Sequence, residues 1–126
     1  MLSISLAMVS LLGIIALFWT HVLADFVAQT DTMAINKSTS NRWLALHVLV
    51  YSVCFLPVCL LIGVSAGVVF CVVNYVAHFV TDYVTSRMTT ALWKQGRRHA
   101  FFVVIGIDQG LHLTALTTSF WWLSRS

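Results

Sequence analysis

Residues 67–84 read GVVFCVVNYVAHFVTDYV, an apolar run close to the ~20 residues that a helix needs to cross a membrane. His78 and Asp82 lie within this run, four positions apart. Because four positions is just over one turn of an α-helix, the two side chains share one face. A charged group in hydrocarbon costs ~3 kcal/mol on insertion scales and usually faces the interior of a helix bundle. The run therefore predicts a transmembrane helix whose polar face meets other helices.

The composition of the whole chain supports the membrane class. Of the 126 residues, 60% are apolar and only 9% are charged, and the mean hydropathy is +0.91. A soluble domain carries about 25% charged residues. Three further apolar segments, at about residues 2–28, 43–62 and 100–123, are long enough to span a membrane. We therefore predict an all-α integral membrane bundle of four transmembrane helices, with residues 1–126 forming a single domain.

Two features shape the middle of the chain. Pro57 lies inside the segment 43–62, where it removes one backbone donor and is expected to kink the helix without ending it. Residues 63–67, GVSAG, are typical of a tight turn. The second and third helices are therefore predicted to form an antiparallel hairpin.

The basic residues predict the orientation of the bundle. Six of the seven Lys and Arg residues fall in the loops after the first and third segments, and only Arg125 lies on the other side. The positive-inside rule makes those two loops cytoplasmic and places both chain ends on the outer side. Topology alone explains the basic loops, so no nucleic-acid partner is expected.

The spacing of His78 and Asp82 recurs in two other segments, and one more histidine lies in a fourth apolar run. The full set of predicted site residues is His21, Asp25, His47, His78, Asp82, Asp108 and His112. Since the helices alternate in direction and rise 1.5 Å per residue, these groups share a layer roughly 5 to 18 Å below the cytoplasmic surface. Four helices delivering polar side chains to one depth indicate a single site.

Several more polar residues follow the same helix faces. Gln29, Tyr51 and Asn74 each lie one turn from a member of the layer, and Gln109 adjoins Asp108. Such groups are suited to hydrogen-bond the outer nitrogen of a metal-binding histidine or a metal-binding carboxylate. Ordinary hydrogen bonds between helices account for them equally well.

The residue types of the layer are those of a metal centre. Neutral imidazoles and carboxylates suit one or two divalent ions, namely zinc, iron or manganese. In a site with two ions, aspartates bridge the metals, histidines fill terminal positions, and a bound water becomes nucleophilic near neutral pH.

A proton relay and a purely structural role stay open as alternatives to a metal centre. Aspartate–histidine pairs relay protons in membrane transport proteins, although the outer half of these segments offers few polar groups. In a structural role, the pairs hold the helices in register, although buried ion pairs stabilise less than apolar packing does.

Two pairs of residues outside the layer have candidate roles. Lys37 and Arg87 lie at the membrane edge, where they bind a phosphate or lipid headgroup or serve only as positive-inside anchors. Gly106 and Gly110 form a small-xxx-small pair nearly opposite Asp108 and His112 on their helix. They predict close packing against a helix of the same chain or of a second copy, and we favour a homodimer.

Five parts of the chain carry a resemblance to a known family: HVLADFVAQTD (21–31), Lys37, LHVLVY (46–51), NYVAHFVTDYVTSR (74–87) and DQGLHL (108–113). Together they resemble the small integral membrane proteins grouped as domain of unknown function 3307, which occur in bacteria and tailed phages. The resemblance implies a multi-pass protein of the bacterial inner membrane and no particular activity. A weaker similarity, in motif style only, to predicted membrane-bound metal-dependent hydrolases favours a metal centre.

The most specific hypothesis is a membrane-embedded metal-binding protein that hydrolyses a lipid or lipid-linked substrate from the cytoplasmic leaflet. The alternative is a non-catalytic bacterial or phage membrane protein that binds another membrane component and uses the His/Asp or metal site to hold its fold. A proton or ion pathway is the second alternative. The expected partners are membrane lipids, a second copy of the chain or another membrane protein.

Overall fold

The computed structural model describes residues 2–125 and the side chains of residues 11–125, and every regular element in this part of the chain is helical. The elements in chain order are α1 (Leu2–Val22), the π-helical segment η1 (Leu23–Val27), α2 (Asp31–Asn36), α3 (Asn41–Cys54), the 3₁₀ turn η2 (Leu56–Val58), α4 (Cys59–Ile62), α5 (Val64–Lys94) and α6 (Arg98–Leu123). The all-helical class predicted from the sequence is therefore confirmed.

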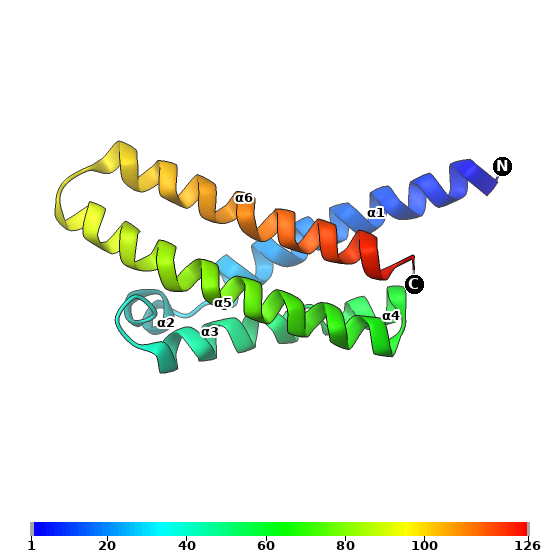
Figure 1. Cartoon of the computed structure of the whole chain (residues 1–126), viewed down its shortest axis with the longest axis horizontal. Coiled ribbons are helices and arrows are strands. Elements are labelled where there is room, and N and C mark those ends of the chain that lie inside the picture. Colours follow the sequence, from blue (N-terminus) through cyan, green and yellow to red (C-terminus); the bar gives the residue numbers. More distant parts are fainter. Residues whose placement is uncertain (1, 126) are drawn as a thin grey trace.

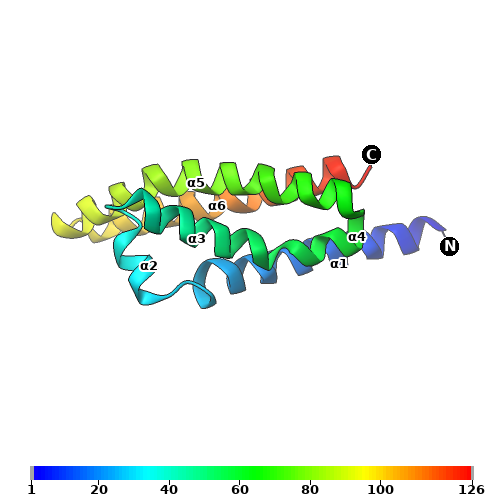
Figure 2. The same cartoon turned by 90° about the horizontal axis from the view of Figure 1, so that it is seen from below.

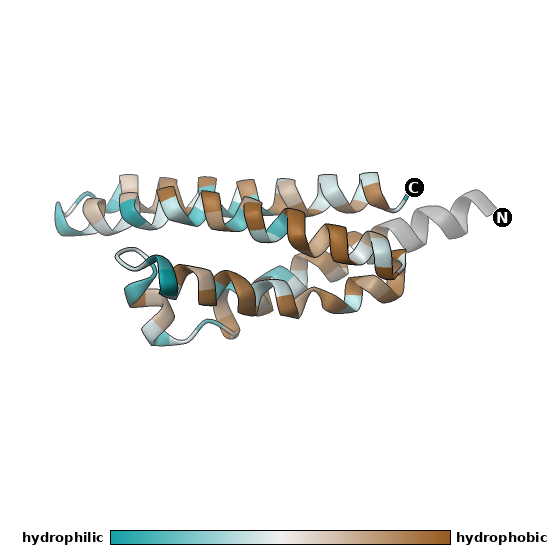
Figure 3. Cartoon of the chain, turned by 60° about the horizontal axis from the view of Figure 1, so that its bottom comes forward, coloured by the Kyte–Doolittle hydropathy of each residue, from teal (hydrophilic) through white to brown (hydrophobic). Residues whose placement is uncertain are grey.

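The long helices form two layers (Figures 1 and 2). Helices α5 and α6 run antiparallel in one layer, and α1 and α3 form the other. Helix α5 packs against both α3 and α6, and α1 contacts α6. The start of α1 and the end of α6 lie at one end of the bundle, while α2 and the α5–α6 turn lie at the other. We call the latter the basic end, because Lys37, Lys94 and Arg97 lie in or next to its connections. Figure 3 shows strongly hydrophilic stretches there.

Among the residues whose side chains are described, three stretches are long and apolar enough to cross a membrane: Asn41–Ile62, Val64–Lys94 and Arg98–Leu123. The fourth predicted span, residues 2–28, forms α1 and η1, and its described part is the apolar helix Leu11–Val27. Large apolar side chains cover the outer surface of the bundle, with Leu60 88% exposed. Exposed apolar area of this kind is typical of a surface that faces another apolar phase or a partner.

Helix α5 is longer than the predicted span. The prediction ends the third segment at residue 84, but the helix continues to Lys94. Residues 85–90 are mostly Ser and Thr, and they remain helical because the α5–α6 pairing extends over them. The extra turns carry the wall of a pocket described below.

The hairpin between α4 and α5 is tighter than predicted. Its turn is Gly63 alone, with a φ of 94°, and α5 begins at the next residue. Gly67 lies inside α5, where a Cβ atom would come within 2.6 Å of the Cα of Cys59. Glycine is therefore required at position 67 for the close approach of two helices, not for a turn.

Pro57 interrupts the second span locally. The α-helix ends at Cys54, a 3₁₀ turn carries the proline, and α4 resumes at Cys59. The proline ring would clash with the carbonyl four residues earlier in a continuous α-helix. The path still runs on from Asn41 to Ile62 as one candidate span.

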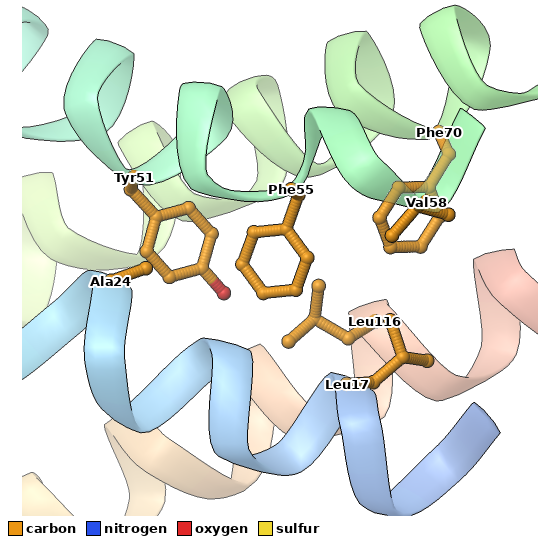
Figure 4. Packing of buried hydrophobic residues seen from close by; sticks show 7 residues of the cluster. All are labelled: Leu17, Ala24, Tyr51, Phe55, Val58, Phe70 and Leu116. Carbon is orange, nitrogen blue, oxygen red and sulfur yellow. The ribbon is translucent and has the colours of Figure 1, made fainter. Parts of the chain in front are cut away.

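An apolar cluster fills the half of the bundle nearer the chain ends (Figure 4). Its members are Leu17, Ala24, Tyr51, Phe55, Val58, Phe70 and Leu116, all of them buried. In Figure 4, Tyr51 and Phe55 reach from the α3 side toward Leu17 of α1 and Ala24 of η1. Most of these residues lie about one or two turns from a histidine or aspartate of the same helix. The cluster therefore closes the polar layer on the side of the chain ends.

Gly106 and Gly110 contact no other helix in the described part of the chain. A Cβ atom added to either would meet nothing within 4 Å. Close packing against a helix of the same chain is therefore not found. Packing against a second copy stays a prediction.

Candidate metal centre

A widened helical turn places Asp25. Its segment, η1, is π-helical, and the amide of Ala28 donates to the carbonyl of Leu23 at 2.8 Å, five residues earlier. Single π-turns inside helices occur frequently at functional sites, because they change the direction of one side chain. Here the carboxylate of Asp25 is buried and lies against histidines of α3 and α5.

Four candidate ligand atoms meet between η1, α3 and α5. Asp25, His47, His78 and Asp82 each contribute one atom, and all four atoms lie within 4.8 Å of one another. The Nε2 atoms of His47 and His78 are 3.1 Å apart. Nε2 of His47 lies 3.2 Å from Oδ1 of Asp25 and 3.3 Å from Oδ2 of Asp82. Nε2 of His78 lies 3.5 Å and 3.3 Å from the same two oxygens.

These separations match five of the six edges of a coordination tetrahedron. Bonds of ~2.0 to 2.1 Å from a tetrahedral zinc ion place neighbouring ligands ~3.3 to 3.4 Å apart. The five separations run from 3.1 to 3.5 Å. Oδ1 of Asp25 is buried without a hydrogen-bond partner in the described structure, as expected for an oxygen that faces a cation instead of a donor.

A second group adjoins the first. Asp25, Asp108 and His112 also offer ligand atoms within 4.8 Å of one another. Nε2 of His112 lies 3.0 Å from Oδ1 of Asp82 and 3.3 Å from Oδ2 of Asp108. Asp82 thus presents Oδ2 to the two histidines of the first group and Oδ1 to His112 of the second. The polar cluster is Asp25, His47, His78, Asp82, Asp108 and His112.

His21 lies behind this cluster. Its Nδ1 is 2.9 Å from the hydroxyl of Tyr51, and its Nε2 is 2.7 Å from Oε1 of Gln109. Since Oε1 of an amide only accepts, Nε2 donates and Nδ1 accepts from Tyr51. The amide nitrogen of Gln109 then donates to Asp25 at 3.0 Å and to Asp108 at 3.1 Å. His21, predicted from the sequence as a ligand, hydrogen-bonds to the cluster through Gln109, and its Nε2 lies 3.9 Å from Oδ2 of Asp25.

Ring packing orients the central histidines. Nδ1 of His47 and of His78 is buried without a hydrogen-bond partner among the described residues. The ring of His78 stacks on that of His112 at 3.9 Å and packs against Tyr51 at 4.0 Å. Most metal-binding histidines donate a hydrogen bond from the ring nitrogen that does not bind the metal. Here aromatic contacts take the place of that bond.

The remaining predicted companions lie farther from the ligand atoms. Asn74 donates to the carbonyl of Phe70 and to Ser119, which links α5 to α6 on the side of the apolar cluster. Gln29 lines a pocket next to the cluster, with its Oε1 buried and unpaired in the described structure. Of the four companions, Gln109 alone bonds directly to the aspartates within the described residues.

The two basic candidates have different environments. Nζ of Lys37 donates to Oδ2 of Asp82 at 2.9 Å. Arg87 donates to the carbonyl of Tyr83 and to Oδ1 of Asn41, and its guanidinium lies 3.8 Å over the ring of Tyr83. Arg87 does not line the pocket, whereas Lys94 does. The basic residues near the site are therefore Lys37 and Lys94.

A pocket of about 450 Å³ joins the polar cluster to the basic end. The carboxylates of Asp25, Asp82 and Asp108 are part of its lining. The wall contributed by α5 was not predicted from the sequence, and it consists of Thr85, Ser86, Thr89, Thr90 and Trp93. The sequence did contain a signal for this wall, since these residues follow Asp82 at the spacing of an α-helix. The hydroxyl of Thr85 also donates to Oδ1 of Asp108.

The sequence matches the family described as "Protein of unknown function (DUF3307)" over residues 14–126. The chain belongs to the DUF3307 family. No curated protein and no solved structure matches it. The DUF3307 match includes the whole polar cluster together with His21, Gln109 and Lys37. Because the family description names no activity, the function of this DUF3307 protein is argued from its geometry.

Proposed function

We propose that this DUF3307 protein is a membrane-embedded metalloprotein that hydrolyses a lipid or lipid-linked substrate from the cytoplasmic leaflet. The observation that carries the proposal is the set of four ligand atoms, with five of their six separations between 3.1 and 3.5 Å, next to a pocket lined by the carboxylates of Asp25 and Asp82. Zinc fits the first group, while iron or manganese in either group would use the same mixture of imidazole and carboxylate ligands.

Charge supports the binding of a cation. With neutral histidines, Asp25, Asp82 and Asp108 carry three negative charges, and Lys37 supplies one positive charge to Asp82. Two negative charges are then left in a cluster of which no member but Asp108 is more than 5% exposed. Uncompensated buried charge is costly, and one divalent ion removes it.

The residues around the cluster suit hydrolysis. A metal ion there would polarise a bound water and the bond under attack. Asp108 lies at the boundary of cluster and pocket, with 14% of its side chain exposed. Its carboxylate accepts the proton of the attacking water, whose oxygen bonds to the carbonyl carbon or phosphorus of the substrate. Thr85 and Gln109 hold that carboxylate in place. The bond between the attacked atom and the leaving oxygen then breaks, and the leaving oxygen takes up the proton that Asp108 accepted.

The membrane orientation follows from the two ends of the bundle. The basic end is assigned to the cytoplasm by the positive-inside rule, which places both termini in the periplasm of the bacterial inner membrane. At this end Arg98 lies 3.5 Å over the ring of Trp93, and near the opposite end Arg125 lies 4.0 Å over Trp121. Aromatic residues beside cations are suited to the two interfaces of a bilayer, and the pocket then faces the cytoplasmic leaflet.

The apolar cluster argues against a proton pathway. A relay requires polar groups or water on both sides of the polar cluster. Phe55, Phe70, Leu17 and Leu116 are nearly fully buried on the side of the chain ends. We therefore favour hydrolysis over a proton pathway as the function of the site.

A non-catalytic structural site is the second candidate, and the ion pair of Lys37 with Asp82 favours it. This contact already neutralises one carboxylate and joins the α2–α3 connection to α5. On this view the His/Asp contacts, with or without a metal, hold the helices together and the pocket binds a membrane partner.

Metal analysis of detergent-purified protein tests the proposal. We expect close to one or two equivalents of a divalent metal, and we expect His78→Ala to lose most of it while the helical circular dichroism persists. His99→Ala is the matched control, since His99 lies outside the polar cluster at the start of α6. Folded wild-type protein without metal, even after incubation with zinc, iron or manganese, would leave the structural network as the better account.

A further inference from the structure

The pocket has a polar wall and an apolar wall. Hydroxyl groups of Thr85, Ser86, Thr89 and Thr90 come from successive turns of α5. The apolar lining includes Phe26, Trp93, Phe101 and Ile105. Phe26 is 53% exposed and Trp93 is 50% exposed, so the apolar wall continues onto the outer surface of the bundle. A ligand matching both walls is an amphiphile whose chain leaves toward the bilayer.

The charges of the pocket change sign when a cation is bound. Asp25, Asp82 and Asp108 contribute three negative charges, and Lys37 and Lys94 contribute two positive charges. Without a metal the sum is one negative charge, and one divalent ion makes it one positive charge. Only the metal-loaded pocket therefore attracts an anion.

Lys94 is placed to meet such an anion. It lines the pocket at the last turn of α5, and within residues 11–125 its ammonium group has no ion pair or hydrogen bond. Lys37 is bound to Asp82 but is also part of the lining. Thr85 and Thr89 donate their hydroxyl protons to Asp108 and to the carbonyl of Ser86, respectively. The hydroxyls of Ser86 and Thr90, by contrast, donate to no group in the described structure. These two donors, between a lysine and a metal centre, suit a group with several acceptor oxygens.

We propose that the pocket binds the phosphate ester headgroup of a lipid, with Lys94 and the hydroxyl row of α5 on the phosphate and the apolar wall on the first part of the chain. This inference rests on the metal centre proposed above. A volume of about 450 Å³ accommodates a headgroup and a short length of chain but not a whole lipid. In hydrolysis, the water oxygen bonds to phosphorus, the ester P–O bond breaks, and the lipid leaves as an alcohol.

Binding of dodecylphosphonate to zinc-loaded protein in detergent tests the inference. Its P–C bond resists hydrolysis, so binding is measured without turnover, by Trp93-dependent fluorescence or calorimetry. We expect Lys94→Gln to weaken binding by about tenfold, and Thr90→Val to weaken it by a smaller factor. Arg97→Gln is the matched control, because this neighbouring basic residue does not line the pocket, and its affinity should equal that of the wild type.

The test depends on two comparisons, one between two ligands and one between two variants of the protein. If inorganic phosphate binds as tightly as dodecylphosphonate, the site takes free phosphate and the lipid part of the inference is overturned. If Lys94→Gln and the wild type bind dodecylphosphonate equally, the headgroup site is overturned. Metal content is measured on the same samples: wild-type protein that retains zinc and binds no phosphonate refutes only this inference, whereas protein that holds no zinc refutes the metal centre.

Discussion

The polar cluster and the apolar cluster lie one to two turns apart on the same helices, but different forces hold them. In the apolar cluster, rings and aliphatic side chains fill space, with the ring centroids of Phe55 and Phe70 5.9 Å apart. In the polar cluster, three carboxylates and three imidazoles crowd together, and several buried nitrogen and oxygen atoms lack hydrogen bonds in the described structure. In the apolar cluster, by contrast, close packing leaves few voids. The difference indicates that one half of the bundle fixes the fold so that the other can keep a set of groups that would not stabilise it alone.

The largest effect on metal binding is expected from removing one carboxylate of the polar cluster. Asp82 offers one oxygen to each group, so Asp82→Asn should weaken metal binding at least ~1,000-fold, or about 4 kcal/mol. Isothermal titration with zinc measures the change, and circular dichroism reports the fold. Asp31→Asn is the control, since Asp31 is the one aspartate outside the cluster. Equal zinc affinity in the two variants would contradict the assignment of Asp82.

The next change acts on the apolar half. Phe70 is fully buried in the apolar cluster, and Phe70→Ala should lower the free energy of unfolding by about 3 kcal/mol, near the lower end for such truncations because lipid is itself apolar. Unfolding in mixed micelles measures this loss. The exposed Phe102 supplies the control Phe102→Ala, which should change stability by less than about 0.5 kcal/mol. Zinc affinity of refolded Phe70→Ala should stay near that of the wild type, and a large loss would show that the halves are not separable.

A change at the boundary should give an intermediate effect. Gln109 links His21 to Asp25 and Asp108, and partners of metal ligands are worth about 10- to 100-fold in metal affinity. Gln109→Leu should therefore weaken zinc binding by about 1.4 to 2.7 kcal/mol. Gln95→Leu, in the α5–α6 turn, serves as the control. An unchanged zinc affinity in Gln109→Leu would mean that the amide does not position the carboxylates.

The two clusters also differ in how far they could be predicted from the sequence. Helical spacing and charge placement were sufficient to predict the helical class and the meeting of six polar residues, because both depend on periodicity. The π-turn at Asp25 has no comparable signal in the sequence. Arg87 lies five positions from Asp82, about 140° around the helix at 100° per residue, and does not line the pocket, whereas Thr89 lies almost on the same face as Asp82 and does. Binding of a phosphate or lipid headgroup by Arg87 stays a prediction. The length of α5 depends on pairing with α6, which no single segment shows.

The smallest effect on the bundle itself is expected on its outer face. Gly106 and Gly110 leave open space around their Cα atoms, so Gly106→Leu should change the stability of one bundle and its zinc affinity by less than about 0.5 kcal/mol. If the pair mediates contact with a second copy, as we expect, the larger side chain keeps the two helices apart and shifts a dimer toward monomer. Sedimentation equilibrium in detergent measures this shift, with Ile107→Leu as the control because Ile107 is exposed on the same helix. A wild type that is monomeric at all concentrations, or a dimer that Gly106→Leu does not weaken, would leave these glycines without a packing role and the outer face to lipid alone.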